Sequence, residues 1–546
     1  IIHLQITGKR TISASQSPNP TKQKLHSTIS MAATPLFLIL LLFSFPPGSH
    51  SQTQNATASP RPQLTEATID TIQLAFKHNT LTSKQLVQFY IDRIHEHNDL
   101  LRAVIEVNPN ALSLAEMADR ERRARVPGSG AGLHGIPVLL KDNIATKDKL
   151  NTTAGSFALL GSVVPRDAGV ARKLRAAGAI ILGKASLSEW SNFRSSSAPN
   201  GFCGRTGIGK NPYVLSADPC GSSSGPGISV AANLVTVAIG SETDGSILCP
   251  SSANSVVGIK PTVGLTSRAG VIPISPRQDS IGPMCRTVAD AVYVLDAIAG
   301  FDSNDDLATR AAARYIPRGG YKQFLKPDGL RGKRLGVVRN PFFQFGGDEA
   351  VAAVFQNHLK TLRKEGAVLV DPVEISNITE ILSSSYEMDA LLAEFKPALN
   401  SYLKHLVSSK VRTLADVIAF NNKFPKLEKT KEYGQDILET SQRLNETNRK
   451  AVREALSKLK QFSENGIEKV MKEQKLDALV AGSSSFSVVL AIGGYPGMSV
   501  PAGYDRGGVP FGIFFGGLMG SEPKLIEIGY GFEQATKVRK PPSFKP

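Results

Sequence analysis

Cysteine is scarce in this chain of 546 residues, which contains only four: Cys203, Cys220, Cys249 and Cys285. Four cysteines are too few for the dense disulfide framework that holds small secreted domains together. Their spacing also excludes a Cys-x-x-Cys pair, which commonly marks redox and zinc sites. Whether any two of the four are bridged stays open at the level of the sequence.

Two further features are missing from the composition. The almost entirely apolar run at residues 36–45 falls well short of the roughly 20 residues that a membrane-spanning helix needs, so we expect no obligate membrane span. No segment interleaves a basic cluster with aromatic residues, so we expect no nucleic-acid partner.

Methionine is absent from residues 1–30, and the first one is Met31. We interpret residues 1–30 as translated upstream sequence and leave them out of the fold. Residues 31–51 join the apolar run to two prolines and to small residues, which is typical of a signal peptide and its cleavage site. A membrane-attached N-terminal anchor is the alternative. The signal peptide predicts a secreted, extracellular protein whose first part, residues 52–64, is a flexible segment.

The formal net charge of the whole chain is +16. Residues 1–51 contain four basic residues and no acidic one, so their removal leaves +12 (16 − 4). Such an excess is typical of a solvated surface, although a secreted basic protein can also adhere to polyanionic wall or matrix polymers.

Helical and strand patterns alternate along residues 65–540, which we predict to form one large domain without a long linker. The alternation predicts an α/β fold with a sheet covered by helices on both faces. We expect helices at 65–98 (with a cap near Thr82), 110–123, 167–177, 228–234, 287–299, 348–365 and 524–536, and strands at 103–107, 179–182, 236–240, 335–338, 367–370 and 477–480.

The composition shifts at residues 380–473, which are rich in Lys, Glu and Leu, poor in glycine and helical in periodicity. We assign them to a helical lid or insertion that would decide substrate preference; the alternative is that they only cover one face of the sheet. Residues 493–517 are rich in Gly and Pro, and we expect them to supply turns around the site.

Two turns of small residues, 221–225 and 244–246, bracket an apolar segment that would hold them at a fixed separation. Each turn presents a serine where glycine lets the backbone come close to a ligand. A third piece, residues 139–144, places Lys141 at the end of a short apolar run typical of a buried strand. A lysine in low dielectric favours its neutral form, which makes it a candidate base for a hydroxyl nucleophile. Together these pieces predict a serine hydrolase that uses lysine in place of histidine.

This stretch resembles the amidase signature family, whose nucleophilic serine, bridging serine and lysine occur in blocks of this kind. The resemblance implies that Ser246 is the nucleophile, that Ser222, held by a cis peptide, is the bridging serine, and that Lys141 is the base. Ser246 lies 24 residues after Ser222 (246 − 222), which is the spacing of the family pattern. Further blocks of the family follow in order, so the resemblance spans residues 65–540; they lie at 133–137, 258–262, 494–503 and 509–512.

The resemblance also implies a single large α/β domain with a mixed sheet. It implies hydrolysis of a carbon–nitrogen amide bond in a small-molecule substrate through an acyl-enzyme intermediate, with no cofactor and no metal. Backbone N–H groups of the second turn would stabilise the oxyanion; these belong to Thr243, Asp244, Gly245 and Ser246. Ser223 would hydrogen-bond Lys141 in a secondary role.

The sequence departs from the family pattern at Cys220, Pro226, Asp244 and Leu248. Leu248 replaces an arginine that commonly follows the nucleophile. Asp244 matters most, because it replaces a glycine of the oxyanion turn. Aspartate tolerates left-handed backbone angles better than most residues, so we expect the turn to survive.

Secretion would make four Asn-x-Ser/Thr sequons candidate glycosylation sites; they lie at Asn55, Asn151, Asn377 and Asn445. We expect about two or three of them to carry a glycan. Asn151 follows Lys141 closely in the sequence, so a loop that rims the active site would make it the least suited of the four.

Two glycine motifs compete with this interpretation. Residues 221–225 also satisfy Gly-x-Ser-x-Gly, a nucleophile elbow with Ser223 as nucleophile, but an elbow must follow a buried strand and residues 216–220 do not suit one. Residues 130–135 match Gly-x-Gly-x-x-Gly but precede a strand, and Pro137 forbids the helix that a pyrophosphate needs.

Three weaker signals remain. Ser457-x-x-Lys460 lacks the motifs that accompany a Ser-x-x-Lys enzyme, and chance on a charged helix explains it. His95-x-His97 stands at a helix end without partner ligands for a metal. His134 lies within the family-like blocks and is interpreted as structural.

Two other functions stay open for a chain of this family. One is an amidotransferase subunit that releases ammonia from glutamine, which needs partner chains and works inside cells or organelles; the signal peptide counts against it. The other is a catalytically silent binding protein, which Asp244 and Leu248 make conceivable. The natural substrate and the oligomeric state stay open as well.

Overall fold

An 11-stranded sheet is the centre of the computed structural model, which describes residues 63–445 and 448–546. The predicted leader 1–30, the predicted signal peptide 31–51, most of the predicted flexible segment 52–64 and Asn55 lie outside the described residues. The strands follow one another across the sheet in the order β1 (Val104–Val107), β3 (Ile180–Ala185), β2 (Pro137–Lys141), β6 (Val237–Glu242), β8 (Ser280–Cys285), β7 (Val257–Lys260), β12 (Gly497–Tyr504), β13 (Pro510–Gly516), β11 (Ala478–Ala481), β9 (Arg334–Val337) and β10 (Val368–Val370).

The sheet is mixed. Strand β2 pairs in parallel with β3 and β6, and β9 pairs in parallel with β10 and β11, whereas the other pairs are antiparallel. A separate two-stranded sheet joins β4 (Phe202–Cys203) to β5 (Gly207–Ile208). The mixed α/β architecture confirms the predicted fold class.

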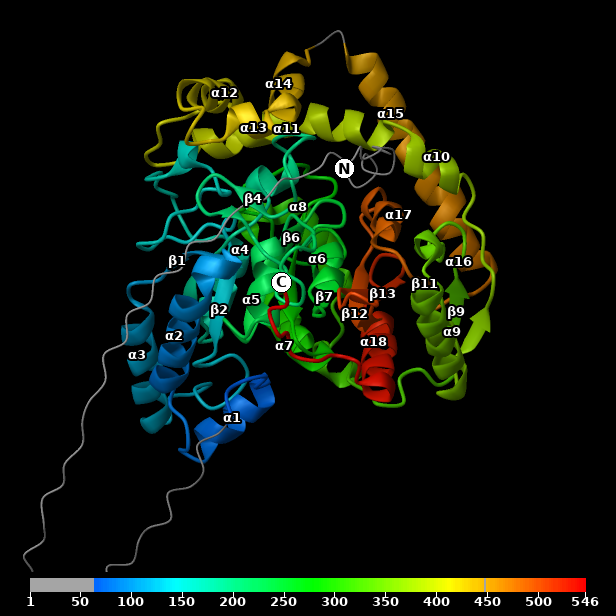
Figure 1. The fold of residues 1–546 in the computed structure, drawn as a ribbon, viewed down its shortest axis with the longest axis horizontal. Coiled ribbons are helices and arrows are strands. Elements are labelled where there is room, and N and C mark those ends of the chain that lie inside the picture. The colour runs from blue at the N-terminus through cyan, green and yellow to red at the C-terminus, as the bar shows by residue number, and fades with distance from the viewer. Residues whose placement is uncertain (1–62, 446–447) are drawn as a thin grey trace, which may run out of the picture. The chain divides into compact units, whose positions relative to one another are not determined.

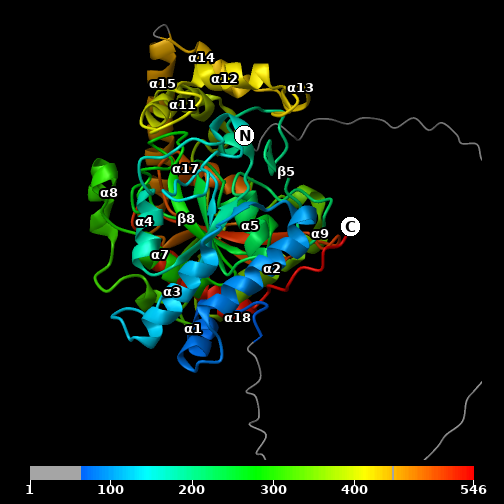
Figure 2. The same cartoon turned by 90° about the vertical axis from the view of Figure 1, so that its left-hand side faces the viewer.

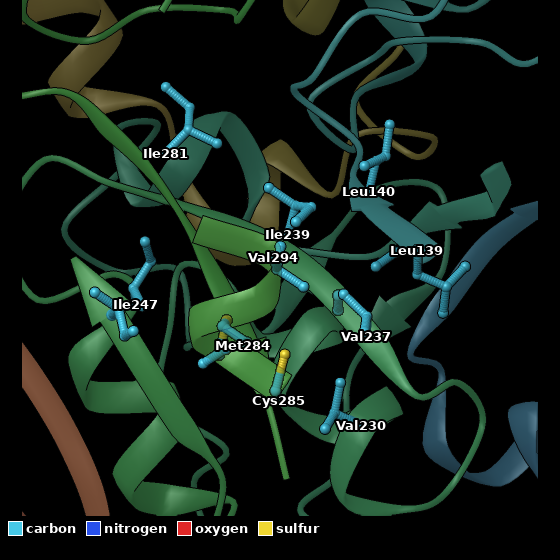
Figure 3. Packing of buried hydrophobic residues seen from close by; sticks show 14 of the residues in the cluster. Leu139, Leu140, Val230, Val237, Ile239, Ile247, Ile281, Met284, Cys285 and Val294 are labelled. Atoms are coloured by element: carbon cyan, nitrogen blue, oxygen red, sulfur yellow. The ribbon is translucent and has the colours of Figure 1, made fainter. Parts of the chain in front are cut away.

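Strands β2, β6 and β8 lie side by side, and every residue of the three is buried. Figure 3 shows Leu139, Ile239 and Met284, one from each strand, within a single apolar cluster. Such continuous burial, without polar alternation, is expected where helices cover both faces of a sheet.

Alternate residues of β12 identify the two faces. Met498 and Val500 contact Gly529 of α18 (Glu522–Thr536), where a Cβ atom would meet the Met498 sulfur at 2.2 Å. A Cβ atom on Gly497 would lie on the opposite face of the sheet, 3.1 Å from Leu248 of α6 (Leu248–Ala253). Helix α5 (Ser224–Ala231) packs with α6, whereas α7 (Val288–Ile298) packs with α18 and α4 (Gly169–Ala176). The expectation of helices on both faces is therefore confirmed.

The helical pattern at residues 65–98 forms two helices, α1 (Ile69–Lys77) and α2 (Ser83–Leu101), and the second begins at the cap expected near Thr82. The break falls at Asn79, whose φ of 56° is incompatible with a continuing helix. Thr82 then caps α2, because its hydroxyl accepts a hydrogen bond from Gln85 N while the Gln85 side chain accepts one from Thr82 N.

Residues 380–473 are helical, as their composition predicts. The segment and its N-terminal flank contain α10 (Ile378–Ser383), α11 (Tyr386–Lys404), α12 (Leu414–Lys423), α13 (Thr430–Tyr433), α14 (Asp436–Arg443), α15 (Arg449–Ser463) and α16 (Lys469–Glu473). Figures 1 and 2 show α11 to α15 together at one end of the sheet, drawn in yellow to orange. Helix α11 packs against α14 and α15. The other α-helices of the described residues are α3 (Ala111–Arg123), α8 (Asp306–Ala312), α9 (Glu349–Lys364) and α17 (Ser487–Ala491).

The prediction for residues 493–517 is wrong in part. This Gly- and Pro-rich stretch forms β12 and β13, an antiparallel pair inside the sheet, instead of only turns. Its glycines fit close packing, since a Cβ on Gly516 would come within 2.7 Å of Leu490 and Phe486. Small residues therefore mark a tightly covered sheet here, which composition alone cannot distinguish from turns.

None of the helices in the described part of the chain is both long and apolar enough to cross a membrane.

Candidate active site

Lys141 is the last residue of β2, and it is fully buried. Its Nζ lies 2.7 Å from Ser222 Oγ and 3.0 Å from both the carbonyl oxygen and the Oγ of Ser241. Ser241 belongs to β6, the parallel neighbour of β2, so the register of the sheet brings the two side chains together. The amine thus has three oxygen partners within hydrogen-bond distance.

Ser222 lies in the turn that precedes α5. The Gly221–Ser222 peptide bond is cis, as the resemblance implies. Ser188 N donates a hydrogen bond of 3.0 Å to Ser222 O, and a Cβ on Gly221 would meet Ser188 Oγ at 2.2 Å. Glycine at 221 therefore allows this close approach of the two backbone segments.

Ser246 follows β6 in the turn that leads to α6, and 7% of it is exposed. Ser223 N donates a hydrogen bond of 3.1 Å to Ser246 O, so the two serine turns touch through the backbone. Behind the turn, Glu242 Oε2 accepts hydrogen bonds from the N–H groups of Ile247 and Leu248, at 2.6 and 2.9 Å. The structure thereby places Lys141, Ser222 and Ser246 in three connected segments.

The predicted oxyanion turn, residues 243–246, is held from two sides. Thr243 Oγ1 donates to Asp279 Oδ1 at 2.6 Å, and Ser487 Oγ of α17 donates to Asp244 Oδ1 at 2.6 Å. The left-handed backbone angle falls on Gly245, with φ 73°, and Asp244 has no positive φ. The aspartate at 244 therefore requires no left-handed backbone, a different reason for the turn's survival from the one that the sequence suggests.

Ser223 makes a contact that its motif does not predict. Its Oγ donates to Ser241 O at 3.0 Å and accepts from Ser241 N at 3.3 Å, and the side chain is fully buried. The expected hydrogen bond between Ser223 and Lys141 is replaced by this indirect one through Ser241. No strand delivers Ser223, because the described residues 209–222 before it are turns and irregular backbone, so the elbow interpretation fails.

Burial sets the ionisation of the amine. It lowers the pKa of Lys141 to about 7, against the opposing influence of the Asp279 and Glu242 carboxylates. Burial also raises the pKa of Asp279 to about 6, although hydrogen bonds from Thr243, Ile274 and Ser275 act in the other direction. A substantial fraction of Lys141 is thus neutral at neutral pH.

A disulfide joins Cys220 to Cys249, with a Cα–Cα distance of 5.9 Å. Cys220 stands two residues before Ser222, and Cys249 lies in α6, three residues after Ser246. The bond therefore ties the two serine turns together, a pairing that the sequence left open. Cys203 and Cys285 are free and buried.

A cavity of about 580 Å³ adjoins Ser241 and Asn143, but Lys141, Ser222 and Ser246 are not among its lining residues. Asn143, Ser241 and Thr243 line it on the side of Lys141, and α11 lines it through Ala398 and Tyr402. Sequence reasoning missed Asn143 and Ser241; the only signal was their place at the ends of neighbouring parallel strands.

Of the described histidines, His405 lines the cavity, whereas His134 does not. His134 Nε2 is 2.9 Å from Glu121 Oε2, which fits the structural role expected for it. Among residues 63–445 and 448–546, no group of three or more His, Cys, Asp or Glu side chains is arranged to hold a metal ion.

Comparison with known proteins gives the class of this chain. It is 60% identical over 481 residues to a protein of Arabidopsis thaliana named "Probable amidase", with 88% of this chain and 92% of the relative covered. A crystal structure of native peptide amidase from Stenotrophomonas maltophilia superposes with a TM-score of 0.82 at 43% identity, and covers 88% of this chain and 99% of the other. The protein is therefore a hydrolase that acts on amides.

The Amidase family matches residues 85–485, and the chain belongs to this family. One subunit of the glutamyl-tRNA(Gln) amidotransferase of Thermoanaerobacter pseudethanolicus is also a relative, at 30% identity over 505 residues, with 88% of this chain and 98% of the relative covered.

Proposed function

We propose that this chain hydrolyses amide bonds with Ser246 as nucleophile, Ser222 as proton relay and Lys141 as base. One observation carries the proposal: the buried Lys141 Nζ lies 2.7 Å from Ser222 Oγ, in a turn that hydrogen-bonds the Ser246 backbone. A neutral amine offers one lone pair and two N–H groups. The lone pair accepts from Ser222, and the two N–H groups donate to the two oxygens of Ser241.

In the first half of the reaction, Ser246 Oγ forms a bond to the amide carbonyl carbon. Its proton passes to Ser222 Oγ while the Ser222 proton passes to Lys141 Nζ. Collapse of the tetrahedral intermediate breaks the carbon–nitrogen bond. Ser222 returns a proton to the departing nitrogen and is reprotonated by the Lys141 ammonium, which leaves an acyl ester on Ser246.

In the second half, water attacks the ester carbonyl and gives a proton to Lys141 through Ser222. The bond between the acyl carbon and Ser246 Oγ then breaks, the relay returns the proton to Ser246 Oγ, and the acid is released. Backbone N–H groups of the turn 243–246 stabilise the oxyanion in both halves. Loss of one such donor typically lowers the rate by about 10²–10³-fold. The hydrogen bonds of Thr243 and Asp244 to Asp279 and Ser487 support this role, because they fix the backbone of the turn.

For the substrate we propose an amide attached to a peptide or to an acylated amino acid. The support is the similarity to a structure titled peptide amidase, at 43% identity over nearly its whole length. Ammonia release from N-acetyl amino acid amides by the purified protein tests this proposal.

Labelling of serine variants with an active-site probe tests the catalytic roles. A fluorophosphonate should label the parent protein and a Ser223→Ala variant, but not a Ser246→Ala variant. Lys141→Ala should lower kcat by about 10²–10⁴-fold, because it removes the base. Labelling that persists in Ser246→Ala, or full turnover in Lys141→Ala, contradicts the assignment.

The amidotransferase alternative is favoured only by the relatives at 30% identity. An amidotransferase subunit would co-purify with partner chains and release ammonia from glutamine. We expect the chain alone to hydrolyse amides. A protein that binds the probe nowhere and hydrolyses no amide would instead be a silent binding protein.

We also propose that the chain follows the secretory route. The signal-peptide pattern at residues 31–51 and the Cys220–Cys249 disulfide support it, since disulfides persist in oxidising compartments. Expression of the chain from Met31 in a eukaryotic host should yield protein in the medium that begins near residue 52, as N-terminal sequencing would report.

A further inference from the structure

Three consecutive residues have left-handed backbone angles in the segment that follows β3. The φ angles of Trp190, Ser191 and Asn192 are 52°, 57° and 69°, and we call these residues the left-handed turn. Such angles are unfavourable for residues other than glycine, and a bulky residue such as tryptophan rarely adopts them. Strain of this kind persists only where surrounding contacts hold it, and it is concentrated at functional sites.

The start of the left-handed turn holds the bridging serine. Ser188 N donates to Ser222 O at 3.0 Å, and Gly221 packs against the Ser188 hydroxyl. At the end of the turn, Asn192 N donates to Ser188 O at 3.1 Å. The position of Ser188, and through it that of the Ser222 backbone, therefore depends on the conformation of the turn.

The middle of the turn reaches the surroundings of the base. Ser191 Oγ accepts a hydrogen bond from Asn143 Nδ2 at 3.2 Å. The same Nδ2 donates to Ser241 Oγ at 2.9 Å, and that oxygen lies 3.0 Å from Lys141 Nζ. The left-handed turn thus supports the proton relay from two directions, at Ser222 and at the neighbours of the amine.

Three buried charged side chains flank the turn, and we call Glu189, Arg194 and Glu428 the ion cluster. Each of the three is at most 2% exposed. Arg194 Nη1 donates to Glu189 Oε1 at 2.8 Å, and Glu189 Oε2 accepts from Gly204 N at 2.6 Å. Because Glu189 precedes the turn and Arg194 follows it, their ion pair ties the two ends of the turn together.

Residues 380–473 complete the ion cluster. Arg194 Nη2 donates to the backbone oxygen of Glu428 at 2.5 Å. The Glu428 side chain returns to the core, where its Oε1 accepts from Ser156 Oγ at 3.0 Å and from Phe157 N at 2.8 Å. The arginine that closes the turn is therefore also a point where the helical segment docks.

We propose that Glu189 and Arg194 are positioning residues for the proton relay, because their ion pair holds the left-handed turn that fixes Ser222. The proposal rests on the function proposed above and adds how the relay is kept in place. Glu428 makes the docking of residues 380–473 part of the same arrangement. When this support is lost, the turn relaxes toward ordinary backbone angles and Ser222 moves out of line with the base and the nucleophile.

Substitution of Asn192 tests the turn itself. Asn192→Val and Asn192→Gly both remove the side-chain amide, but only valine, which is β-branched, disfavours the left-handed angle. With N-acetylphenylalanine amide as substrate, we expect Asn192→Val to lower kcat by about 10–100-fold while KM changes less than about twofold. Asn192→Gly should keep kcat within about threefold of the parent.

Substitution of Glu428 tests the ion cluster from the side of the helical segment. Burial raises the pKa of Glu428, so glutamine resembles its protonated form and keeps the acceptor oxygen. We expect Glu428→Ala to lower kcat by about 10–100-fold and Glu428→Gln to keep it within about fivefold. Asp119→Ala is the matched control, because Asp119 is also a buried carboxylate, paired with Arg122 and accepting from Ser83 N, and it should leave kcat unchanged.

Tryptophan fluorescence reports the turn independently of activity, because Trp190 is the only tryptophan of the chain. Trp190 is 2% exposed, so acrylamide should quench it weakly in the parent protein. We expect Asn192→Val and Glu428→Ala to raise the quenching constant by at least about twofold, because they loosen the turn locally. Asn192→Gly, Glu428→Gln and Asp119→Ala should quench like the parent. Circular dichroism verifies that each variant is folded.

The outcomes separate the two proposals. A parent protein that hydrolyses no amide and binds no fluorophosphonate overturns the proposed function, and the positioning role with it. In an active parent, three results each overturn the positioning role alone: full kcat in Asn192→Val, a lower kcat in Glu428→Ala without a change in Trp190 quenching, or an equal loss of kcat in Asp119→Ala. If Glu428→Ala does not fold, the two Asn192 variants decide.

Discussion

Three lysines are fully buried in the part of the chain that the structure describes, and their contacts distinguish them. Lys184 Nζ donates to Ile144 O and Thr152 Oγ1, and Lys260 Nζ donates to Tyr495 O, so both hold backbone segments. Burial lowers the pKa of all three, that of Lys184 to about 8. A low pKa therefore does not single out the base. Lys141 alone of the three has a serine of the two turns within hydrogen-bond distance.

The dependence of activity on pH follows from the residue that acts as base. Lys141 accepts a proton only in its neutral form, which predominates above its pKa of about 7. We therefore expect kcat/KM to rise about tenfold per pH unit below 7 and to level off above pH 8. Initial rates between pH 5 and 9, with circular dichroism to verify that the fold persists, would measure the midpoint.

Lys184→Met provides the control at this scale, because it removes another buried lysine of lowered pKa. The activity of this variant can change, but the midpoint of its pH profile should equal that of the parent protein. A midpoint that moves in Lys184→Met, or a parent profile that is flat from pH 6 to 9, contradicts the assignment of the base to Lys141.

At the scale of elements, local pattern predicts most of the fold. Apolar runs such as residues 179–182 and capped periodic segments such as 348–365 become β3 and α9, since their own residues specify the structure. We did not predict strands β12 and β13, because glycines, which normally signal turns, here allow close packing against α6 and α17. The order of strands across the sheet depends on long-range pairing that no local pattern encodes.

The candidate site likewise contains residues that sequence motifs predict and residues that only the fold brings together. Lys141, Ser222 and Ser246 stand in short motifs whose spacing is visible in the sequence. Ser241 and Asn143 carry no motif, and only the parallel register of β2 and β6 brings them to the amine. The indirect contact of Ser223 with Lys141 through Ser241 depends on the same register.

The Cys220–Cys249 disulfide connects two elements, the turn before α5 and helix α6. It closes a segment with a sequence separation of 29, so its loss should lower the free energy of unfolding by about 3–4 kcal/mol. Because both serine turns adjoin it, kcat should fall as well. A Cys220→Ser/Cys249→Ser double variant, studied by urea unfolding and amide hydrolysis, measures both effects.

Cys203→Ser is the matched control for that variant. Cys203 is a free, buried thiol whose sulfur lies 3.1 Å from Thr206 Oγ1, a contact that a serine hydroxyl can keep. We expect a change in unfolding free energy of less than about 1.5 kcal/mol and an unchanged kcat. Equal losses in the single and double variants would show that the bridge has no special part in holding the turns.

At the scale of the whole molecule, the cavity shows how distant segments combine. Its lining comes from residues near 143, 164, 191, 241, 272, 304 and 402, so no single stretch of the sequence indicates the cavity. Helix α11, within the segment set apart by composition, completes the wall. The division between a catalytic sheet and a helical segment that shapes its cavity explains why the motifs predict the chemistry but leave the substrate open.

The asparagines of three sequons are described, and their exposure and the hydrogen bonds of Asn151 predict which of them would carry a glycan if the protein is secreted. Asn151 Nδ2, the atom that a glycan would occupy, donates to Glu106 Oε1 at 2.7 Å, and its Oδ1 accepts from Gly161 N. Asn377 and Asn445 are exposed. In protein secreted from a eukaryotic host, we expect glycans at Asn377 and Asn445 and none at Asn151, measured as mass changes of tryptic peptides on treatment with a glycosidase.

Asn377→Gln and Asn445→Gln should each remove one glycan, whereas Asn151→Gln should remove none and should lower stability, because Glu106 loses a donor. A glycan at Asn151, or secreted protein without any glycan, contradicts this pattern.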